Sequence, residues 1–420
     1  MPFHKKKSDD YIPLSSEKLS ILKEAFAAIK LIIIDEVSMV GADTLLTIHR
    51  RLCDIMSNSS PLSIICVGDL LQLPPVGQRA VFSDPSDEMA AIYGSLWKTH
   101  FKIIELTEVQ RQKGDQSFAD LLNRMRVGEH TVEDIALLNS RQISQTNPMY
   151  PAQATHVFAY NKDIHHHNSS MLETLTNHCY TLHVKDSKRD EQTKRIEITS
   201  FPDMSGGLPK ELILTIEARV ILTGTKNLDV TDGLVNSAAG VVTRFLPTPD
   251  PDDDTYSPKF VLIKFDDECI GRKKRQVSKA ILPDDISTPI PTVELPIRIG
   301  NNNKVTSKRT QFPLVHAWGV TIHKEQGKTE DKLVLSCKGS FNAGQFYTAI
   351  SRMKDLDGLF LLDEVTPAKI KVNIKSLEEI CKMASESPFI SMDPIIFTMP
   401  METYIKLNIL NINSLIPLLV

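Results

Sequence analysis

The sequence predicts an α/β protein with parallel sheets and a small β-barrel inserted late in the chain. Two apolar runs, residues 31–34 and 63–67, have the length of strands, and a helical pattern at 41–56 separates them. Strand–helix–strand alternation with short loops indicates a parallel sheet, whose strands are buried on both faces. From about residue 178 to 305 short β-rich runs alternate with Gly- and Pro-rich turns, and this change of pattern predicts the barrel.

The remaining elements follow from the same periodicities. Further helices are expected at 16–29, 118–125, 131–139 and 344–353, and further strands at 211–216, 219–222, 240–245, 259–265, 312–320 and 332–336. The Pro- and Asp-rich stretch 247–258 is expected to be an exposed loop, and the segment after about 386 has no clear period.

Composition limits the possible classes of protein. A chain of 420 residues is expected to form two or three domains. A formal net charge of −4 excludes a global positive field, so a nucleic-acid contact would have to be local. The six cysteines are scattered, as in reduced proteins, and we find neither a signal peptide nor an apolar run of about 18 residues. These features favour an intracellular protein without a membrane span.

Two adjacent carboxylates, Asp35 and Glu36, end the first apolar strand. Ligands of open α/β sheets bind at the carboxyl ends of strands. Hydrolysis of a nucleoside triphosphate needs one carboxylate to hold Mg²⁺ and a second one to orient or deprotonate the attacking water. The alternative interpretation, a strand followed by a solvated acidic turn, is about equally probable from these two residues alone.

The end of the second strand favours the triphosphatase interpretation. Gly68 permits a tight exit from the strand, and Pro74 and Pro75 stiffen the loop that carries Gln72. An amide at this position can donate to a γ-phosphate while it accepts from the attacking water. We therefore expect Gln72 to act as a sensor of hydrolysis.

Five motifs in the correct order resemble the Pif (petite integration frequency) family of superfamily-one DNA helicases, which includes the helicase part of Helitron-type transposons. They are DEVSM at 35–39 (motif II), GDLLQLPP at 68–75 (motif III), ELTEVQRQ at 105–112 (motif IV), FPLVHAWGVTIHKEQG at 312–327 (motif V) and QFYTAISR at 345–352 (motif VI). The resemblance covers roughly residues 1–385.

The resemblance implies two RecD-like parallel-sheet lobes, the first one incomplete, with an inserted SH3-like β-barrel accessory domain. The implied boundaries are 1–103 for the partial first lobe, 104–209 and 305–385 for the two parts of the second lobe, 210–304 for the barrel and 386–420 for a C-terminal extension. It also implies ATP-driven 5′-to-3′ movement along single-stranded DNA and unwinding of duplex junctions, in DNA repair, recombination or telomere maintenance.

The resemblance also assigns roles to single residues. Asp35 would hold Mg²⁺, Glu36 would activate water, Gln72 would sense the γ-phosphate, and Arg111 and Arg352 would act as arginine fingers. The other expected contacts with ATP are Gln326 and Gly327, and those with single-stranded DNA are Thr321, His323 and Lys324. A guanidinium suits the finger role because it donates bidentately to phosphate oxygens.

The sequence departs from the family pattern at two places. No phosphate loop of the form G-x-x-x-x-G-K-[ST] precedes the first strand, so we expect an N-terminally truncated chain with weakened nucleotide binding. Gly327 and Lys328 mimic the end of such a loop, but Ile322 stands where its first glycine belongs. Glu325 replaces a small residue beside the DNA contacts, so it either points away from DNA or weakens this contact.

Three other features carry weaker expectations. The basic run at 272–275 would meet DNA phosphates in about one case in three, because charge runs are more often solvated surface. The histidines at 165–167 are not expected to bind a metal, since consecutive side chains diverge. Asn236 is expected to shape a turn.

We weigh three functions for the chain. The first is the ATP-dependent DNA helicase described above, located in the nucleus of a eukaryote or in a mitochondrion. The second is a truncated or degenerate helicase that acts only as a DNA-binding or scaffold module, which the missing phosphate loop favours. The third is a RecD-type recombination helicase, which fits motifs II, III and IV less well. Oligomeric state does not follow from the sequence.

Overall fold

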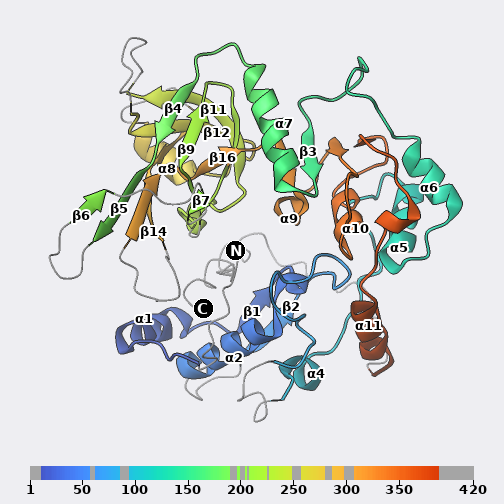
Figure 1. Cartoon of the computed structure of the whole chain (residues 1–420). Coiled ribbons are helices and arrows are strands. Elements are labelled where there is room, and N and C mark those ends of the chain that lie inside the picture. Colours follow the sequence, from blue (N-terminus) through green and yellow to red (C-terminus); the bar gives the residue numbers. More distant parts are fainter. Residues whose placement is uncertain are drawn as a thin grey trace. The chain divides into compact units, whose positions relative to one another are not determined.

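The computed structural model forms two compact units, Met1–Ala152 with Glu325–Val420 and Gln153–Lys324 (Figure 1). It describes residues 11–56, 62–85, 94–189, 196–198, 204–205, 208–224, 227–247, 257–279, 286–297 and 307–386. Most of the expected loop at 247–258 and the extension after 386 lie outside the described residues. The first unit joins two segments that are distant in the sequence, and this arrangement brings motifs II, III, IV and VI into one body.

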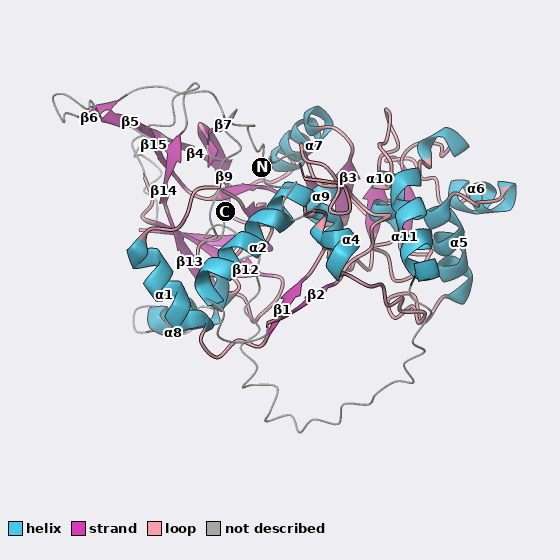
Figure 2. Cartoon of the chain, turned by 90° about the horizontal axis from the view of Figure 1, so that it is seen from below, coloured by secondary structure: helices cyan, strands magenta, loops and turns pink. Residues whose placement is uncertain are grey.

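The first unit contains helices and short parallel strands (Figure 2). Its helices are α1 (Ser16–Phe26), α2 (Ala42–Met56), α4 (Leu96–His100), α5 (Gln116–Val127), α6 (Val132–Asn139), α10 (Gln345–Ile350) and α11 (Ile374–Glu386), with 3-10 turns η1 (Val37–Met39) and η3 (Pro367–Lys369). Its strands are β1 (Leu31–Ile34), β2 (Ser63–Cys66), β18 (Leu333–Leu335) and β19 (Leu359–Leu361).

Strands β1 and β2 pair in parallel, with Leu31 opposite Ser63 and Ile34 opposite Cys66. The predicted strand–helix–strand order is therefore confirmed. The prediction that both strands are buried on both faces is wrong, because their burial alternates. Leu31 and Ile33 are 42% and 41% exposed. In the described part of the chain, α1 and α2 pack their apolar side chains against only the opposite face.

Helices α5 and α6 begin at side chains that cap their first turns. Asp115 accepts from the backbone N–H of Phe118 at the start of α5. Thr131 and Asp134 form a capping box at the start of α6. The Asp134 carboxylate also accepts two hydrogen bonds from Arg124, at 2.8 and 2.6 Å. This ion pair joins the two helices and fixes the direction of α5.

The second unit is rich in strands, as the sequence predicts. Its helices are α7 (Asn161–Glu173), α8 (Arg272–Ser278) and most of α9 (Ile322–Glu325), with a 3-10 turn η2 (Val230–Asp232). Its strands are β3 (Thr155–Phe158), β4 (Tyr180–His183), β5 (Lys185–Arg189), β6 (Ile196–Ile198), β7 (Met204–Ser205), β8 (Leu208–Pro209), β9 (Glu211–Leu214), β10 (Arg219–Leu222), β11 (Ala239–Leu246), β12 (Phe260–Phe265), β13 (Thr288–Pro291), β14 (Val293–Ile297), β15 (Ser307–Gln311), β16 (Leu314–His316) and β17 (Gly319–Thr321).

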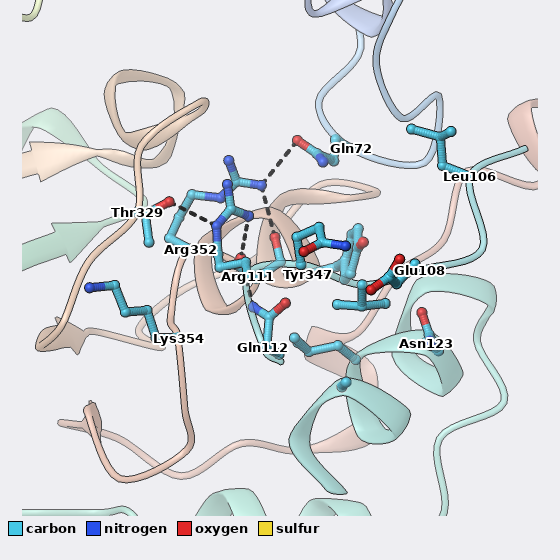
Figure 3. Close-up of a pocket in the computed structure, with 15 residues that line it drawn as sticks. Gln72, Leu106, Glu108, Arg111, Gln112, Asn123, Thr329, Tyr347, Arg352 and Lys354 are labelled. Carbon is cyan, nitrogen blue, oxygen red and sulfur yellow. Dashed lines mark hydrogen bonds between the residues drawn. The ribbon is translucent and has the colours of Figure 1, made fainter. Parts of the chain in front are cut away.

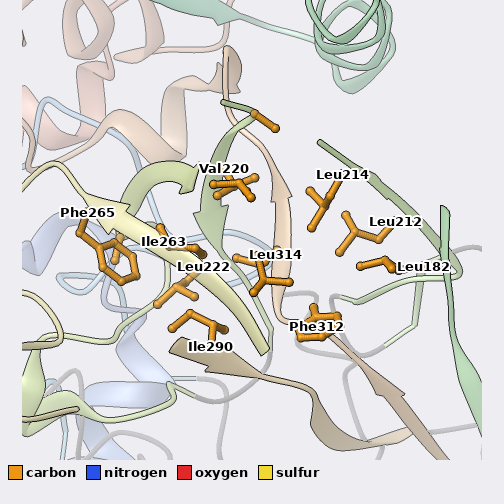
Figure 4. Close-up of a cluster of buried hydrophobic side chains, with 14 of the residues drawn as sticks. Leu182, Leu212, Leu214, Val220, Leu222, Ile263, Phe265, Ile290, Phe312 and Leu314 are labelled. Atoms are coloured by element: carbon orange, nitrogen blue, oxygen red, sulfur yellow. The ribbon is translucent and has the colours of Figure 1, made fainter. Parts of the chain in front are cut away.

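Five strands of this unit form an antiparallel sheet in the order β13-β12-β11-β10-β16. Its core consists of aliphatic and aromatic side chains that alternate along the strands (Figure 4). Val220, Leu222, Ile263 and Leu314 lie in this cluster and are at most 2% exposed. Burial of the apolar side chain contributes about 1.5–3 kcal/mol at each such position. The sheet is therefore the stable centre of the unit.

The strand expected at 312–320 is two strands. β16 pairs antiparallel with β10, whereas β17 pairs in parallel with β3. Asn168 of α7 fixes the start of β17, because its side chain accepts from the N–H of Gly319 at 2.7 Å and donates to the C=O at 3.1 Å. A run of apolar residues cannot reveal this change of partner.

None of the helices in the described residues is long and apolar enough to cross a membrane. All six cysteines are free, and Cys337 is the buried one. Burial raises the pKa of the Cys337 thiol to about 12, so this thiol is unreactive.

Candidate functional site

The ends of β1 and β2 bring the two candidate strand exits together. The N–H of Val67 donates to the C=O of Ile34 at 2.8 Å, and the N–H of Val37 donates to the C=O of Val67 at 2.9 Å. Gly68, with φ +145°, lies so close that a Cβ there would be 2.8 Å from the Val37 nitrogen. Only glycine fits this approach, which holds the two loops side by side.

Glu36 has an uncommon backbone conformation, with φ 52° in the left-handed region. Asp35 is exposed, and its Oδ1 accepts from the N–H of Glu36 at 2.8 Å. The two carboxylates therefore leave the strand in different surroundings. A non-glycine residue held at positive φ costs about 1–3 kcal/mol, and such strain occurs preferentially at functional sites.

The Glu36 carboxylate meets a segment almost 300 residues later in the chain. Gln326 Nε2 donates to Glu36 Oε2 at 2.8 Å and approaches the hydroxyl of Ser38 at 3.5 Å. Gly327, with φ +83°, follows, and a Cβ there would be 3.6 Å from Glu36 Oε1. The buried Oε1 of Gln326 has no hydrogen-bond partner among the described residues. The amide thus holds Glu36 and keeps an acceptor for a further donor.

Two arginines lie side by side in the same unit (Figure 3). Arg111 donates to Thr329 Oγ1 at 2.9 Å and to the C=O of Ser351 at 2.8 Å. Arg352, only 2% exposed, donates to the C=O of Thr348 at 3.0 Å and to Gln72 Oε1 at 3.3 Å. The predicted sensor and one predicted finger are therefore in contact.

The electrostatics of this pair favour an anion. Burial lowers the pKa of the Arg352 guanidinium, and the positive charge of Arg111 lowers it further. Burial also lowers the pKa of Arg111. The charge of Glu36 opposes both decreases. Two partly desolvated cations this close together repel each other, so a bound anion would stabilise both.

A pocket of about 760 Å³ opens beside the arginines. Figure 3 shows Gln72, Arg111 and Arg352 on its wall, together with Tyr347 and Thr329. This volume is in the range of small-molecule and cofactor sites, about 300–1,000 Å³. The arrangement can bind a ligand with a strongly negative end.

The predicted DNA contacts lie in the second unit. Thr321 ends β17, and His323 and Lys324 belong to α9. Glu325 follows in the first unit; it is 0% exposed, and its Oε1 accepts from Lys328 at 2.8 Å. Of the two alternatives for Glu325, the structure supports a side chain that is turned inward.

The weaker sequence features have structural explanations. His167 packs its ring against His156, with centroids 4.1 Å apart. Within the described part of the chain, no three His, Cys, Asp or Glu side chains form a metal-binding group. Asn236 donates to the C=O of Gly224 at 2.9 Å and so closes a turn. Of the basic run, Arg275 points inward and donates to the hydroxyl of Thr288 at 2.9 Å.

Three residues that contact the site have no role in the sequence analysis. Asp69 accepts hydrogen bonds from Arg126 of α5 and from Tyr347 of α10. Asp69 and Tyr347 lie inside the quoted motifs. The position of Asp69 directly after a tight strand exit could have indicated a role for it. Nothing in the sequence pairs this aspartate with Arg126.

Comparison with known proteins finds similarity to DNA helicases. A model of the family described as PIF1-like helicase matches residues 5–135. The ATP-dependent DNA helicase PIF1 of Xenopus laevis is 28% identical over 373 residues, which are 87% of this chain and 51% of that protein. The chain is thus similar in sequence to PIF1-like helicases.

Further relatives and solved structures show the same similarity. The human ATP-dependent DNA helicase PIF1 is 29% identical over 79% of this chain and 45% of that protein. The crystal structure of Pif1 helicase from Candida albicans, 28% identical, covers 88% of this chain and 80% of that chain with a TM-score of 0.64. A Bacteroides Pif1 bound to single-stranded DNA, 23% identical with a TM-score of 0.65, shares the fold. The chain spans about half the length of the curated relatives it matches.

Proposed function

We propose that the chain carries the ATP-hydrolysing and DNA-translocating part of a 5′-to-3′ DNA helicase. The observation that carries this proposal is the cluster of Glu36, Gln72, Arg111 and Arg352 within one unit, beside a pocket of about 760 Å³. The similarity to relatives named ATP-dependent DNA helicases supports it. One Bacteroides Pif1 structure is described as a complex with ADP-AlF3 and single-stranded DNA.

In this proposal Glu36 is the general base for the attacking water. The bond from Gln326 Nε2 fixes one carboxylate oxygen, so the other, Oε1, is oriented toward Gly327 and the water. The unpartnered Oε1 of Gln326 can accept a hydrogen bond from the second O–H of the same water. A positioned base typically contributes about 10²–10⁴-fold to the rate.

Arg111 and Arg352 receive the negative charge that develops on the γ-phosphate. Both guanidiniums are partly desolvated, which strengthens their attraction for a phosphate oxygen. Gln72 already accepts from Arg352, so a γ-phosphate would compete with it for the same donor. Hydrolysis would return Arg352 to Gln72, and this exchange lets the Gln72 loop report the nucleotide state.

Asp35 fits an Mg²⁺ site because it is an exposed carboxylate at the strand end, and Mg²⁺ prefers oxygen ligands and keeps several waters. Bound there with ATP, Mg²⁺ would neutralise phosphate charge. Gly327 would let the nucleotide approach the backbone.

Thr321, His323 and Lys324 would contact single-stranded DNA. They lie at the end of a parallel strand and in the short helix that follows it, the part of an α/β sheet where ligands bind. We infer two RecD-like lobes at 1–103 and at 104–209 with 305–385, an SH3-like barrel at 210–304 and an extension at 386–420. The antiparallel order of β10 to β13 supports the barrel.

The competing function is a DNA-binding or scaffold module without hydrolysis. The observation that favours it is the lack of a phosphate-loop pattern in the printed sequence. Such a loop supplies backbone N–H groups and a lysine to the β- and γ-phosphates. In this case the chain would bind single-stranded DNA without consuming ATP.

An ATPase assay on the chain, with and without single-stranded DNA, separates the two functions. We expect DNA-stimulated hydrolysis that Glu36→Gln reduces by about 10²-fold or more, because the amide cannot take a proton. Glu24→Gln, at an exposed position of α1, is the matched control and should leave hydrolysis unchanged. DNA binding without ATPase activity, or activity that survives Glu36→Gln, would contradict the helicase proposal.

A further inference from the structure

Asp69 is the most fully hydrogen-bonded carboxylate at the site. Its Oδ1 accepts from Arg126 Nη2 and from the N–H of Leu71, each at 3.0 Å. Its Oδ2 accepts from Arg126 Nε at 3.0 Å and from the hydroxyl of Tyr347 at 3.2 Å. The Asp69 and Arg126 side chains are 16% and 25% exposed. A planar bidentate pair of this kind fixes orientation as well as distance.

The same aspartate sets the turn that carries Gln72. The C=O of Asp69 accepts from the N–H of Gln72 at 3.0 Å, so backbone and side chain both close the turn. The start of α10 packs tightly on it: a Cβ at Gly344 would lie 2.7 Å from the C=O oxygen of Leu71 and closer still to that of Gln72. Substitution of this glycine would push the turn and the helix apart.

These contacts close a ring of residues. The hydroxyl of Tyr347, a residue of α10, donates to Asp69. Arg352 follows the C-terminal end of α10 and donates to Gln72, which is three residues after Asp69. Arg126 anchors the ring to α5. Burial and the charge of Asp69 raise the pKa of Tyr347, so its hydroxyl keeps the proton that it donates.

We propose that Asp69, Arg126 and Tyr347 form a latch that positions the Gln72 turn against Arg352. Asp69 is thus a positioning residue, which acts on the phosphate end of the site through Gln72 and Arg352. The inference rests on the proposed function for the roles of these last two residues, but the latch itself is a statement about structure. Without it, the turn and α10 would move independently, and the Gln72–Arg352 contact would become transient.

Helix α5 offers a matched control for the latch. Arg124, two residues before Arg126, forms a bidentate pair with Asp134 at 2.8 and 2.6 Å. Arg124→Gln and Arg126→Gln thus remove the same group from the same helix. Tyr347→Phe removes one bond of the latch and keeps the aromatic ring, so it covers the case in which Arg126→Gln does not fold.

Hydrogen–deuterium exchange tests the latch without any nucleotide. We expect Arg126→Gln to speed amide exchange by at least about tenfold in both 70–73 and 348–353. The first segment follows Asp69, which loses its charged partner, and the second is attached to Asp69 through Tyr347. Tyr347→Phe should change the same two segments by a smaller factor. Arg124→Gln should change exchange only near 131–134. Faster exchange that stays within α5 for Arg126→Gln, or an equal effect of Arg124→Gln at 70–73, would overturn the latch.

Steady-state ATPase kinetics test what the latch does for catalysis. We expect Arg126→Gln to lower kcat by about tenfold, with KM changed less than about threefold, because alignment matters most in the transition state. Unchanged kcat in a variant with a loosened turn would overturn the positioning role. If the parent chain hydrolyses no ATP, the proposed function fails, while the exchange experiment still decides whether the latch exists.

Discussion

Replacing Asp186 with asparagine tests how much of the second unit depends on one buried ion pair. Arg309 donates to the two oxygens of Asp186 at 2.8 and 2.6 Å, and the two side chains are 0% and 2% exposed. Arg309 also donates to the C=O of Leu208 at 3.0 Å. Asparagine has the same size but no charge, so the bidentate ion pair between Arg309 and Asp186 would be lost. Breaking such a pair costs about 3–5 kcal/mol.

The size of the unit converts this cost into a shift of Tm. Unfolding entropy of about 2.1 cal/mol/K per residue gives roughly 0.36 kcal/mol/K for a unit that spans Gln153–Lys324. A loss of about 3–5 kcal/mol then lowers the Tm of this unit by about 8–14 °C. The shift is well above the error of a calorimetric scan.

Differential scanning calorimetry of the whole chain measures this shift. Lys308, the residue before Arg309 on β15, pairs with Glu294 at 2.5 Å, but these side chains are 56% and 52% exposed. Lys308→Gln is therefore the control, and we expect it to lower Tm by less than about 3 °C, because exposed pairs contribute about 0–1 kcal/mol. If Asp186→Asn lowered Tm no more than Lys308→Gln, the argument from burial would be refuted.

Two further predictions concern acid stability and the strand exit. Burial lowers the pKa of His156 to about 4, so the folded state resists a proton that the unfolded state takes up near pH 6.5. The His156 contribution to stability should be full above about pH 6.5 and should fall by about 3 kcal/mol toward pH 4. Denaturant unfolding at several pH values checks this; the neighbouring His167, whose pKa burial also lowers to about 4, adds a slope of its own. A slope in His156→Phe as steep as in the parent chain would contradict the prediction. Gly68→Ala should destabilise the first unit by more than about 2 kcal/mol, because its Cβ would meet the Val37 nitrogen at 2.8 Å and φ is +145°. Gly77→Ala, where φ is +70° and the space is open, should cost about 1 kcal/mol; equal losses in a thermal melt would refute the steric argument.

The part of the site that sequence predicts is the part that local rules determine. Asp35 and Glu36 follow a strand, and the next strand ends beside them, because the carboxyl ends of neighbouring parallel strands meet at one edge. The burial of the strands cannot be predicted from such local rules. The sequence predicts apolar faces on β1 at both Ile32 and Ile33, but which face is covered depends on helices elsewhere in the chain.

Long-range partners are the part that sequence cannot supply. The bond from Gln326 to Glu36 joins residues 290 positions apart, and the bond from Arg352 to Gln72 joins residues 280 positions apart. Resemblance to the motifs identifies these residues as members of one site. Only the folded structure shows which of them are hydrogen-bonded to each other. Asp69 and Arg126 illustrate the same limit, because nothing in the sequence around either residue indicates that the two form a bidentate pair.

Glu325 shows how a residue that seems unsuitable in the sequence can fit the site. A buried carboxylate is costly unless it is paired, and Lys328 one turn later provides the pair at 2.8 Å. The negative charge of Glu325 also helps Arg352 to keep its proton, against the burial and the Arg111 charge that lower its pKa. A small residue at this position would leave Arg352 with less compensation. The carboxylate therefore serves the cationic centre of the first unit, and because it is turned inward it need not repel a DNA phosphate.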